Sequence, residues 1–385
     1  MSTPVDTIRV AKKTGENAQM RAIDMKIDVT AAAELGQDAH VAVTITLPDP
    51  STMPSAPIVC FAKPGGGYSR GYYTVDLPGP ARGAQADWHA QRGWIFVSVD
   101  HLGVGDSSIH DAAMLDYTTT AAANMAAEAE VLRLLAEGAL VEGFPKIVDP
   151  VKIGIGQSMG GCLTIIQQGR YHCYDGVAVL GYSAVHTHPP VRPGTEPIVA
   201  PWLPRDTLLH GAVPVVVNAG AVENFKSKMA MRGPTSGTAE HPMLWGFHFA
   251  DDYDAEMKEM ALIDLARFFH IHDPAKQVGV ACQPWGSLTT PGAVAQSCLT
   301  PGAVAPEAAA ITVPVLVGMG ERDTTADVPG EPRAYRSAPS VDIFVCPRMS
   351  HMHNFAATRG LFWERIARFA DWAACYKASR QNPGQ

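Results

Sequence analysis

The sequence predicts an α/β protein with a mostly parallel sheet of the eight-stranded type, covered by helices on both faces and interrupted by a long insertion. Short, continuously apolar runs alternate with helical segments along most of the chain, which is typical of buried parallel strands. The composition changes over residues 186–310, which are rich in Pro, Trp, Met and His. One stretch, Val151–Cys162, has the pattern of a strand, a sharp turn and the start of a helix.

The elements can be assigned in chain order. Two antiparallel strands come first, because apolar residues alternate on both sides of a polar loop; they are Ile23–Val29 and His40–Leu47. The apolar runs predict further strands at Pro57–Ala62, Trp94–Val99, Val151–Gly156, Gly176–Ser183, Ile311–Gly318 and Val341–Val345. Helical spacing predicts helices at Ala121–Leu140, Leu163–Gln168, Ala255–Phe269 and about Arg359–Lys377, the last with Phe362, Ile366, Phe369 and Trp372 on one face.

This order divides the chain into three parts. Residues 1–185 and 311–385 carry the strand and helix alternation and are predicted to form one sheet domain. Residues 186–310 are predicted to form a cap inserted between two strands of that sheet.

Composition and charge exclude several classes of protein. With 46% apolar residues and 18% charged residues the chain has ample material for a core. The net charge of −8 and the lack of a dense Lys/Arg cluster argue against a nucleic-acid partner. No run has signal-peptide or membrane-spanning length, so we expect a cytoplasmic protein without a membrane partner that acts on a small molecule. Homo-oligomer formation is left open.

The seven cysteines support the same location. They are odd in number and lack CxxC spacing, which predicts neither a disulfide framework nor a zinc knuckle. One bridge inside the insertion, Cys282–Cys298, is left open.

The turn after the strand at Val151–Gly156 reads Gly156-Gln157-Ser158-Met159-Gly160. Small flanking residues allow the strained backbone of such a turn and leave the Ser158 hydroxyl exposed at its tip. A second Gly-x-Ser-x-Gly match is centred on Ser69. It follows a glycine run and precedes Pro78 and Pro80, which is a poor start for a helix. The context favours Ser158 as the nucleophile.

The strand, turn and helix around Ser158 resemble the nucleophile elbow of the α/β-hydrolase superfamily, as in serine esterases and lipases. The resemblance implies the chain order serine, acid, histidine, each at the carboxyl end of a strand. Asp323 follows the strand Ile311–Gly318 and matches the acid, with Glu321 and Asp327 as alternatives. His351 follows the next strand and matches the histidine, with His353 as the alternative.

The same resemblance implies two backbone donors for the oxyanion of a tetrahedral intermediate. One is the N–H of Met159, the residue after the nucleophile. The other comes from the run Pro64–Tyr68, where this chain has three glycines and lacks the histidine that the family often has. Gly66 and Gly67 are both candidates. The segment Asp100–Ser107 resembles a scaffold loop of the family that has no chemical role.

Three His-x-His pairs raise the question of a metal site: His186/His188, His270/His272 and His351/His353. The run His-x-His-x-Asp-His of metallo-hydrolases is absent, and His270/His272 has no further ligand nearby in sequence. We therefore expect neither a metal nor a cofactor.

Substrate choice is expected to depend on aromatic residues of the cap and of the glycine loop. The candidates for substrate contact are Tyr68, Trp202, Trp245, Phe247 and Trp285. Arg70 is also close to the glycine loop in sequence. The alternative for most cap aromatics is a small core of the cap itself.

The function implied by these residues is hydrolysis of a carboxylic ester or lactone of a bulky, apolar substrate through an acyl-enzyme. An amidase, a C–C bond hydrolase or an acyltransferase would use nearly the same residues, and a non-catalytic ligand-binding protein could share the fold. A serine at the elbow argues against haloalkane dehalogenase and epoxide hydrolase chemistry, for which the resemblance would require an aspartate.

Overall fold

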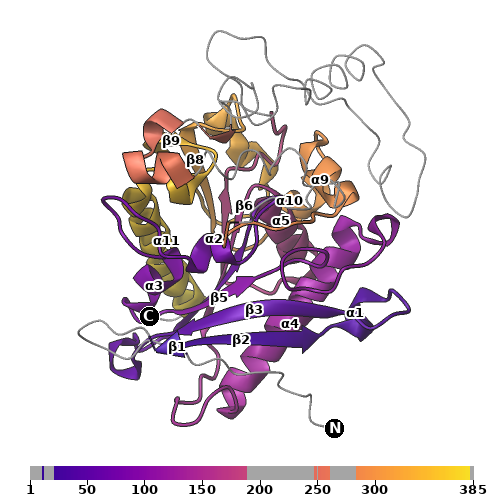
Figure 1. Ribbon diagram of the computed structural model, residues 1–385, viewed down its shortest axis with the longest axis vertical. Coiled ribbons are helices and arrows are strands. Elements are labelled where there is room, and N and C mark those ends of the chain that lie inside the picture. Colours follow the sequence, from indigo (N-terminus) through magenta and orange to yellow (C-terminus); the bar gives the residue numbers. More distant parts are fainter. Residues whose placement is uncertain (1–10, 13–20, 189–246, 249, 261–282, 382–385) are drawn as a thin grey trace.

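A computed structural model describes residues 11–12, 21–188, 247–248, 250–260 and 283–381 of the 385-residue chain. These residues form a nine-stranded sheet in the order β1-β2-β3-β5-β4-β6-β7-β8-β9, with helices on both faces (Figure 1). The pairs from β1 through β3 to β5 are antiparallel, and every pair from β5 to β9 is parallel. The predicted α/β class with a mostly parallel sheet is confirmed.

Every strand expected from the apolar runs is present. The strands are β1 Ala11–Lys12, β2 Arg21–Asp28, β3 His40–Leu47, β4 Ile58–Lys63, β5 Ile95–Val99, β6 Val151–Gln157, β7 Gly176–Leu180, β8 Val315–Arg322 and β9 Val341–Ser350. The largest extension is in β9. It continues to Ser350 because its residues still pair with β8, around an irregularity between Gly320 and Arg322.

Helices cover the sheet in two layers (Figure 1). One layer contains α4 Tyr117–Glu137, α5 Met159–Tyr171, α9 Gly292–Leu299 and α10 Ala305–Ala310; the other contains α3 Gln85–Ala90 and α11 Arg359–Gln381. Shorter helices are α1 Thr30–Ala33, α2 Gly71–Thr74 and the 3-10 turns η1 Pro50–Thr52, η2 Ala112–Met114, η3 Ala250–Asp252, η5 Val328–Ala334 and η6 His353–Phe355. The expected helix Ala255–Phe269 is helical over 255–260, and its remainder lies outside the described residues.

The two layers enclose two hydrophobic clusters, and β4 shows how the sequence divides between them. Val59 and Phe61 join the cluster beneath α4 and α5. Ile58, Cys60 and Ala62 join the cluster beneath α11. Because successive strand residues face opposite sides, a run that is apolar at every position fits only a sheet covered on both faces.

The parallel strands end together, and this positions the loops that follow them. Lys63 at the end of β4 pairs with Gly156 of β6, and Gln157 of β6 pairs with Leu180 at the end of β7. Leu180 in turn pairs with Gly318 of β8. The loops after these strands therefore meet at one edge of the sheet.

The end of the expected cap packs directly on the sheet domain. Val294 and Val304 belong to the same cluster as the sheet, and Arg170 of α5 forms an ion pair with Glu307 of α10 at 2.9 Å. The Gly302 N–H also donates to the Val185 carbonyl. Helices α9 and α10, within residues 292–310, thus form part of the helical layer, and the division of the chain at 185 and 310 stays a prediction.

None of the helices in the described ranges combines the length and the apolar character needed to cross a bilayer.

Candidate active site

Ser158 occupies a strained turn between β6 and α5. Its backbone angles are φ 54° and ψ −117°, a region that residues other than glycine rarely adopt. A Cβ on Gly156 would lie 2.1 Å from the Gly160 carbonyl oxygen, and a Cβ on Gly160 would lie 2.1 Å from the Lys63 carbonyl oxygen. Both glycines are therefore required by close backbone approach, as the sequence predicted for a sharp turn.

Asp323 and His351 meet at the ends of β8 and β9. His351 Nδ1 lies 2.7 Å from Asp323 Oδ1, and the two side chains are 3% and 1% exposed. The carboxylate also accepts the N–H groups of Thr324 and Gly320, each at 2.8 Å. The register of β8 and β9 shifts between Gly320 and Arg322, just before Asp323.

A second histidine bonds the same carboxylate. His353 Nε2 lies 2.6 Å from Asp323 Oδ2. Burial alone would raise the pKa of Asp323, but His353, His351 and the hydrogen bonds outweigh burial and hold this pKa well below its usual range. An ionised carboxylate only accepts, so His351 carries its proton on Nδ1 and His353 carries its proton on Nε2.

The alternative acids lie elsewhere. Glu321 is exposed and accepts the Arg348 N–H at 2.8 Å. Asp327 is exposed, accepts the Gly330 N–H and forms an ion pair with Arg333 at 3.2 Å. Among the three candidates, Asp323 is the one that bonds a histidine.

A side-chain bond from Gln157 and a backbone bond from Ser158 link the turn to this pair and to the end of β7. The Ser158 N–H donates to the Leu180 carbonyl at 2.8 Å, and Gln157 Nε2 donates to the His351 carbonyl at 2.8 Å. Gly181, which follows Leu180, has φ 58°. A Cβ built on it would lie 3.1 Å from His351 Nδ1 and 3.3 Å from Asp323 Oδ1. The structure thus brings Ser158, Asp323 and His351 to one edge of the sheet.

The glycine loop lies against the elbow. A Cβ on Gly65 would lie 3.1 Å from Ser158 Cβ, and a Cβ on Gly66 would lie 3.8 Å from Met159 Sδ. Met159 is the first residue of α5, so its N–H has no acceptor within the helix. The Gly67 N–H donates to Thr290 Oγ1 at 2.9 Å, whereas no hydrogen bond of the Gly66 N–H occurs among the described residues.

Buried polar groups that the sequence analysis did not identify hold this loop in place. Lys63 is fully buried and pairs with Glu128 of α4 at 2.7 Å, and the Tyr73 hydroxyl donates to the Lys63 carbonyl at 2.7 Å. His101 Nε2 lies 3.0 Å from the Pro64 carbonyl oxygen. Burial lowers the pKa of His101 to about 4. A lysine at the end of an otherwise apolar strand is the signal that could have revealed this anchor.

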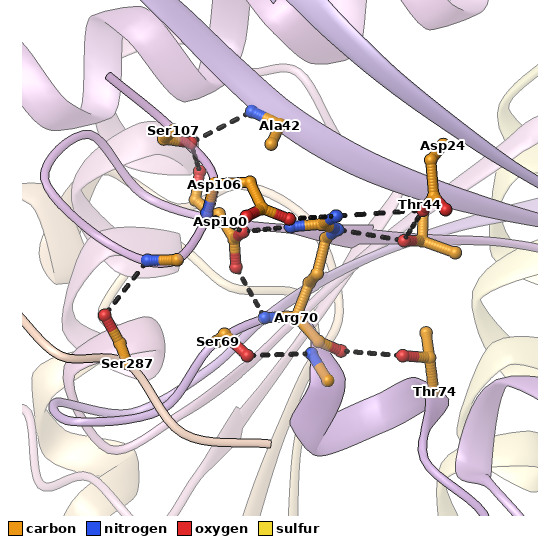
Figure 2. Close-up of polar contacts among 12 residues, drawn as sticks. Asp24, Ala42, Thr44, Ser69, Arg70, Thr74, Asp100, Asp106, Ser107 and Ser287 are labelled. Atoms are coloured by element: carbon orange, nitrogen blue, oxygen red, sulfur yellow. Dashed lines mark hydrogen bonds and ion pairs between the residues drawn. The ribbon is translucent and has the colours of Figure 1, made fainter. Parts of the chain in front are cut away.

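Arg70 lies near the glycine loop in sequence, and its side chain points toward Thr44, Asp100 and Asp106 (Figure 2). Its backbone N–H donates to Asp100 Oδ1 at 2.6 Å, and its guanidinium bonds Thr44 at 2.9 Å, Asp106 at 2.7 Å and Asp100. These bonds join β3 to the loop after β5, and a substrate contact of Arg70 stays a prediction.

Ser69, the centre of the second Gly-x-Ser-x-Gly match, has a structural role. Its buried hydroxyl donates to the Pro284 carbonyl at 3.4 Å and accepts the Gly71 N–H at 3.2 Å. Neither partner is a base, and the choice of Ser158 as the nucleophile stays a prediction.

The aromatic candidates for substrate contact separate into three groups. Phe247 packs on His351 with ring centroids 4.9 Å apart. Tyr68 and Trp285 are 1% and 0% exposed and pack on Phe355 in the cluster beneath α11. Trp202 and Trp245 lie outside the described residues.

The two remaining questions concern metals and disulfides. The rings of His186 and His188 are 3.9 Å apart, but the described part of the chain contains no group of three or more His, Cys, Asp or Glu that could hold a metal ion. His270 and His272 fall outside it. Cys298 is a free, buried thiol, and Cys282 also lies outside the described residues.

Comparisons with known proteins identify the fold. No protein-family model and no curated protein sequence matches the chain. Solved structures do resemble it. A thermophilic esterase from Thermogutta terrifontis shares 12% identity at a TM-score of 0.52, over 91% of this chain and 99% of that one. An esterase from Exiguobacterium antarcticum shares 15% identity at a TM-score of 0.52, over 90% of this chain and 100% of that one. A peroxisomal alpha-beta-hydrolase from Saccharomyces cerevisiae shares 10% identity at a TM-score of 0.51, over 93% of this chain and 90% of that one.

Proposed function

Because the chain has the α/β-hydrolase fold, we propose that it is a serine hydrolase that cleaves a carboxylic ester or a lactone of a bulky apolar substrate through an acyl-enzyme. The observation that carries this proposal is the strained Ser158, linked through the Gln157 side chain to the buried Asp323–His351 pair. A serine hydroxyl is a weak nucleophile, and this arrangement supplies the base and the group that orients the base.

In the first half-reaction the Ser158 hydroxyl attacks the substrate carbonyl carbon, and His351 Nε2 takes the proton. Asp323 keeps the proton of His351 on Nδ1 and stabilises the imidazolium that forms. The N–H groups of Met159 and Gly66 stabilise the oxyanion at the N-terminus of α5, where the helix dipole also favours negative charge. His351 then protonates the leaving alkoxide, and the acyl group remains on Ser158.

In the second half-reaction a water molecule attacks the acyl carbon. His351 accepts a proton from this water and returns it to Ser158 Oγ as the acid product leaves.

The choice of Gly66 over Gly67 as the oxyanion donor rests on Thr290, whose hydroxyl already accepts the Gly67 N–H. No step requires a group beyond the chain, the substrate and water.

An apolar substrate is supported by Phe247. Its ring packs on His351 and is partly exposed, so an apolar side chain lies beside the base where substrate must bind.

A fluorophosphonate probe tests the proposal, because it reacts only with an activated serine. We expect the wild type to be labelled on the peptide that contains Ser158, and Ser158→Ala to be unlabelled. Ser69→Ala is the matched control and should label normally, since its hydroxyl bonds only backbone groups. Labelling that survives Ser158→Ala would contradict the proposal, and an unlabelled wild type would favour a non-catalytic ligand-binding protein.

The substrate class requires a second measurement. Hydrolysis of p-nitrophenyl esters of increasing chain length, beside a panel of lactones and amides, should give kcat/KM values that rise with acyl size. Acetate as the preferred acyl group would argue against the bulky apolar substrate, and preference for amides would replace the ester by a peptide or amide.

A further inference from the structure

Asp323 lies between two imidazoles that use opposite ring nitrogens. His351 Nδ1 bonds Oδ1 at 2.7 Å, and His353 Nε2 bonds Oδ2 at 2.6 Å. Both histidine side chains are 3% exposed. With the N–H groups of Gly320 and Thr324, the carboxylate accepts four donors, while the mechanism above uses only His351.

His353 uses only one of its two ring nitrogens for hydrogen bonds among the described residues. Its Nδ1 is buried and has no hydrogen-bond partner within the described ranges. The ring packs on Phe362 of α11, with centroids 4.5 Å apart. A proton on Nδ1 would be a buried donor without an acceptor, which costs about 1–3 kcal/mol. His353 is therefore a fixed donor to Asp323, whereas His351 has Nε2 left for proton transfer.

The backbone of η6 fixes His353 in turn. The next residue, Asn354, donates from its backbone N–H to the Tyr72 hydroxyl at 2.9 Å and from its side chain to the Tyr72 carbonyl at 3.0 Å. Trp363 Nε1 donates to Asn354 Oδ1 at 2.8 Å. His353 thus connects the carboxylate to α2 and α11 through a rigid, buried chain of hydrogen bonds.

We propose that His353 is a positioning residue for Asp323: its Nε2–H fixes the orientation of the carboxylate and withdraws negative charge from it. This inference rests on the proposed function. A carboxylate that shares its charge among four donors stabilises the protonated form of His351 less than a carboxylate with three donors would. His353 would therefore extend the pH range in which His351 acts as a base toward lower pH.

Other ionisable groups near this trio are present in wild type and variants alike. They are Tyr72 from α2, Arg322 with its ion-pair partner Asp252, and Glu331 from η5. None of the bonds to Asp323 comes from these groups.

Two variants separate this role from simple packing. His353→Gln keeps an N–H donor within reach of Asp323, and His353→Leu removes the donor while keeping an apolar side chain against Phe362. For the best ester of the panel, we expect kcat of His353→Leu to fall about tenfold with little change in KM. The acid limb of its kcat/KM profile should shift upward by about half a pH unit. His353→Gln should stay within about threefold of wild type, with an unshifted profile.

Superimposable pH profiles for wild type and His353→Leu, or equal losses for the Leu and Gln variants, would overturn the proposal. A readout without catalysis separates it from the proposed function. The one-dimensional proton NMR spectrum of the full chain should show two strongly downfield imidazole N–H resonances. Ser158→Ala should retain both and His353→Leu should lose one. An inactive wild type with both resonances would refute the hydrolase and leave the shared carboxylate standing; one resonance in the wild type would refute the shared carboxylate.

Discussion

At the scale of single residues, Ser158 shows how the site stores strain. Its φ of 54° and ψ of −117° are imposed by the tight junction of β6 and α5. Backbone in such a region costs about 1–3 kcal/mol for a residue with a Cβ. The Leu180 carbonyl and the packing of Gly160 on the Lys63 carbonyl hold the turn in place despite this cost.

Replacing Ser158 should reveal that strain. Ser158→Gly should be more stable than Ser158→Ala by about 1 kcal/mol, because strain relief exceeds the extra entropy of glycine in the unfolded chain. Urea unfolding of the two inactive variants measures the difference. Equal midpoints would mean that the turn is relaxed.

The sequence predicted the positions of Ser158, Asp323 and His351 because each follows a parallel strand, and such strands end at one edge of the sheet. It could not predict that His353 bonds the same carboxylate. Spacing places two histidines in one loop, but the start of η6 decides which ring nitrogen meets which oxygen. The contact of Thr290 with Gly67 was equally hidden, since 223 residues separate the two.

At the scale of elements, β4 and α4 position the glycine loop. Lys63 at the end of β4 is fully buried and lies 2.7 Å from Glu128 and 2.6 Å from the Tyr174 hydroxyl. Gln167 of α5 donates to the same glutamate at 2.7 Å. The glycine loop begins at the next residue, so a buried ion pair anchors the end of the strand from which this loop starts.

Removing one partner of the Lys63–Glu128 pair should lower the free energy of unfolding, and removing both charges should restore part of the loss. Lys63→Met leaves the Glu128 charge buried without its cation and should destabilise the chain by about 3–5 kcal/mol. The double variant Lys63→Met/Glu128→Gln should recover at least half of that loss, as measured by urea unfolding in a double-mutant cycle. Arg133→Met, which removes two ion pairs on the surface of α4, is the control and should leave the midpoint unchanged. A double variant no better than Lys63→Met would contradict this account.

The elements of the sheet could be predicted because buried parallel strands are written as uninterrupted apolar runs, as in β4 and β7. The place of α9 and α10 could not. They are short and follow a stretch whose composition differs from that of the sheet domain, and three-dimensional contacts such as Arg170–Glu307 assign them to the layer over the sheet.

At the scale of the whole molecule, two buried histidines limit acid stability. Burial lowers the pKa of His89 to about 3 and that of His101 to about 4. In the unfolded chain both titrate near 6.5. Below that pH the unfolded state binds protons that the folded state excludes, so stability falls as pH falls. Each histidine contributes a loss of about 1.4 kcal/mol per pH unit between pH 6.5 and its folded pKa.

The variant His101→Gln isolates this effect and keeps an N–H donor for the Pro64 carbonyl. Between pH 7.5 and pH 5 the free energy of unfolding should fall for both proteins. The loss should be about 2 kcal/mol smaller for the variant than for wild type. The exposed His172, in left-handed backbone at the end of α5, supplies the control His172→Asn, which should follow wild type. Parallel curves for His101→Gln and wild type would show that His101 is not responsible.

The site of the insertion has a consequence for how this scaffold can change. The chain leaves after β7 and returns before β8, two strands that are paired to each other, and the Thr324 carbonyl accepts the His188 N–H at the point of departure. Because the two ends are held together by the sheet, doubling the length of chain between them costs only about 0.6 kcal/mol of closure entropy. The chain between β7 and β8 can therefore change in length at this junction at little cost to the sheet, whose strand ends carry Ser158, Asp323 and His351.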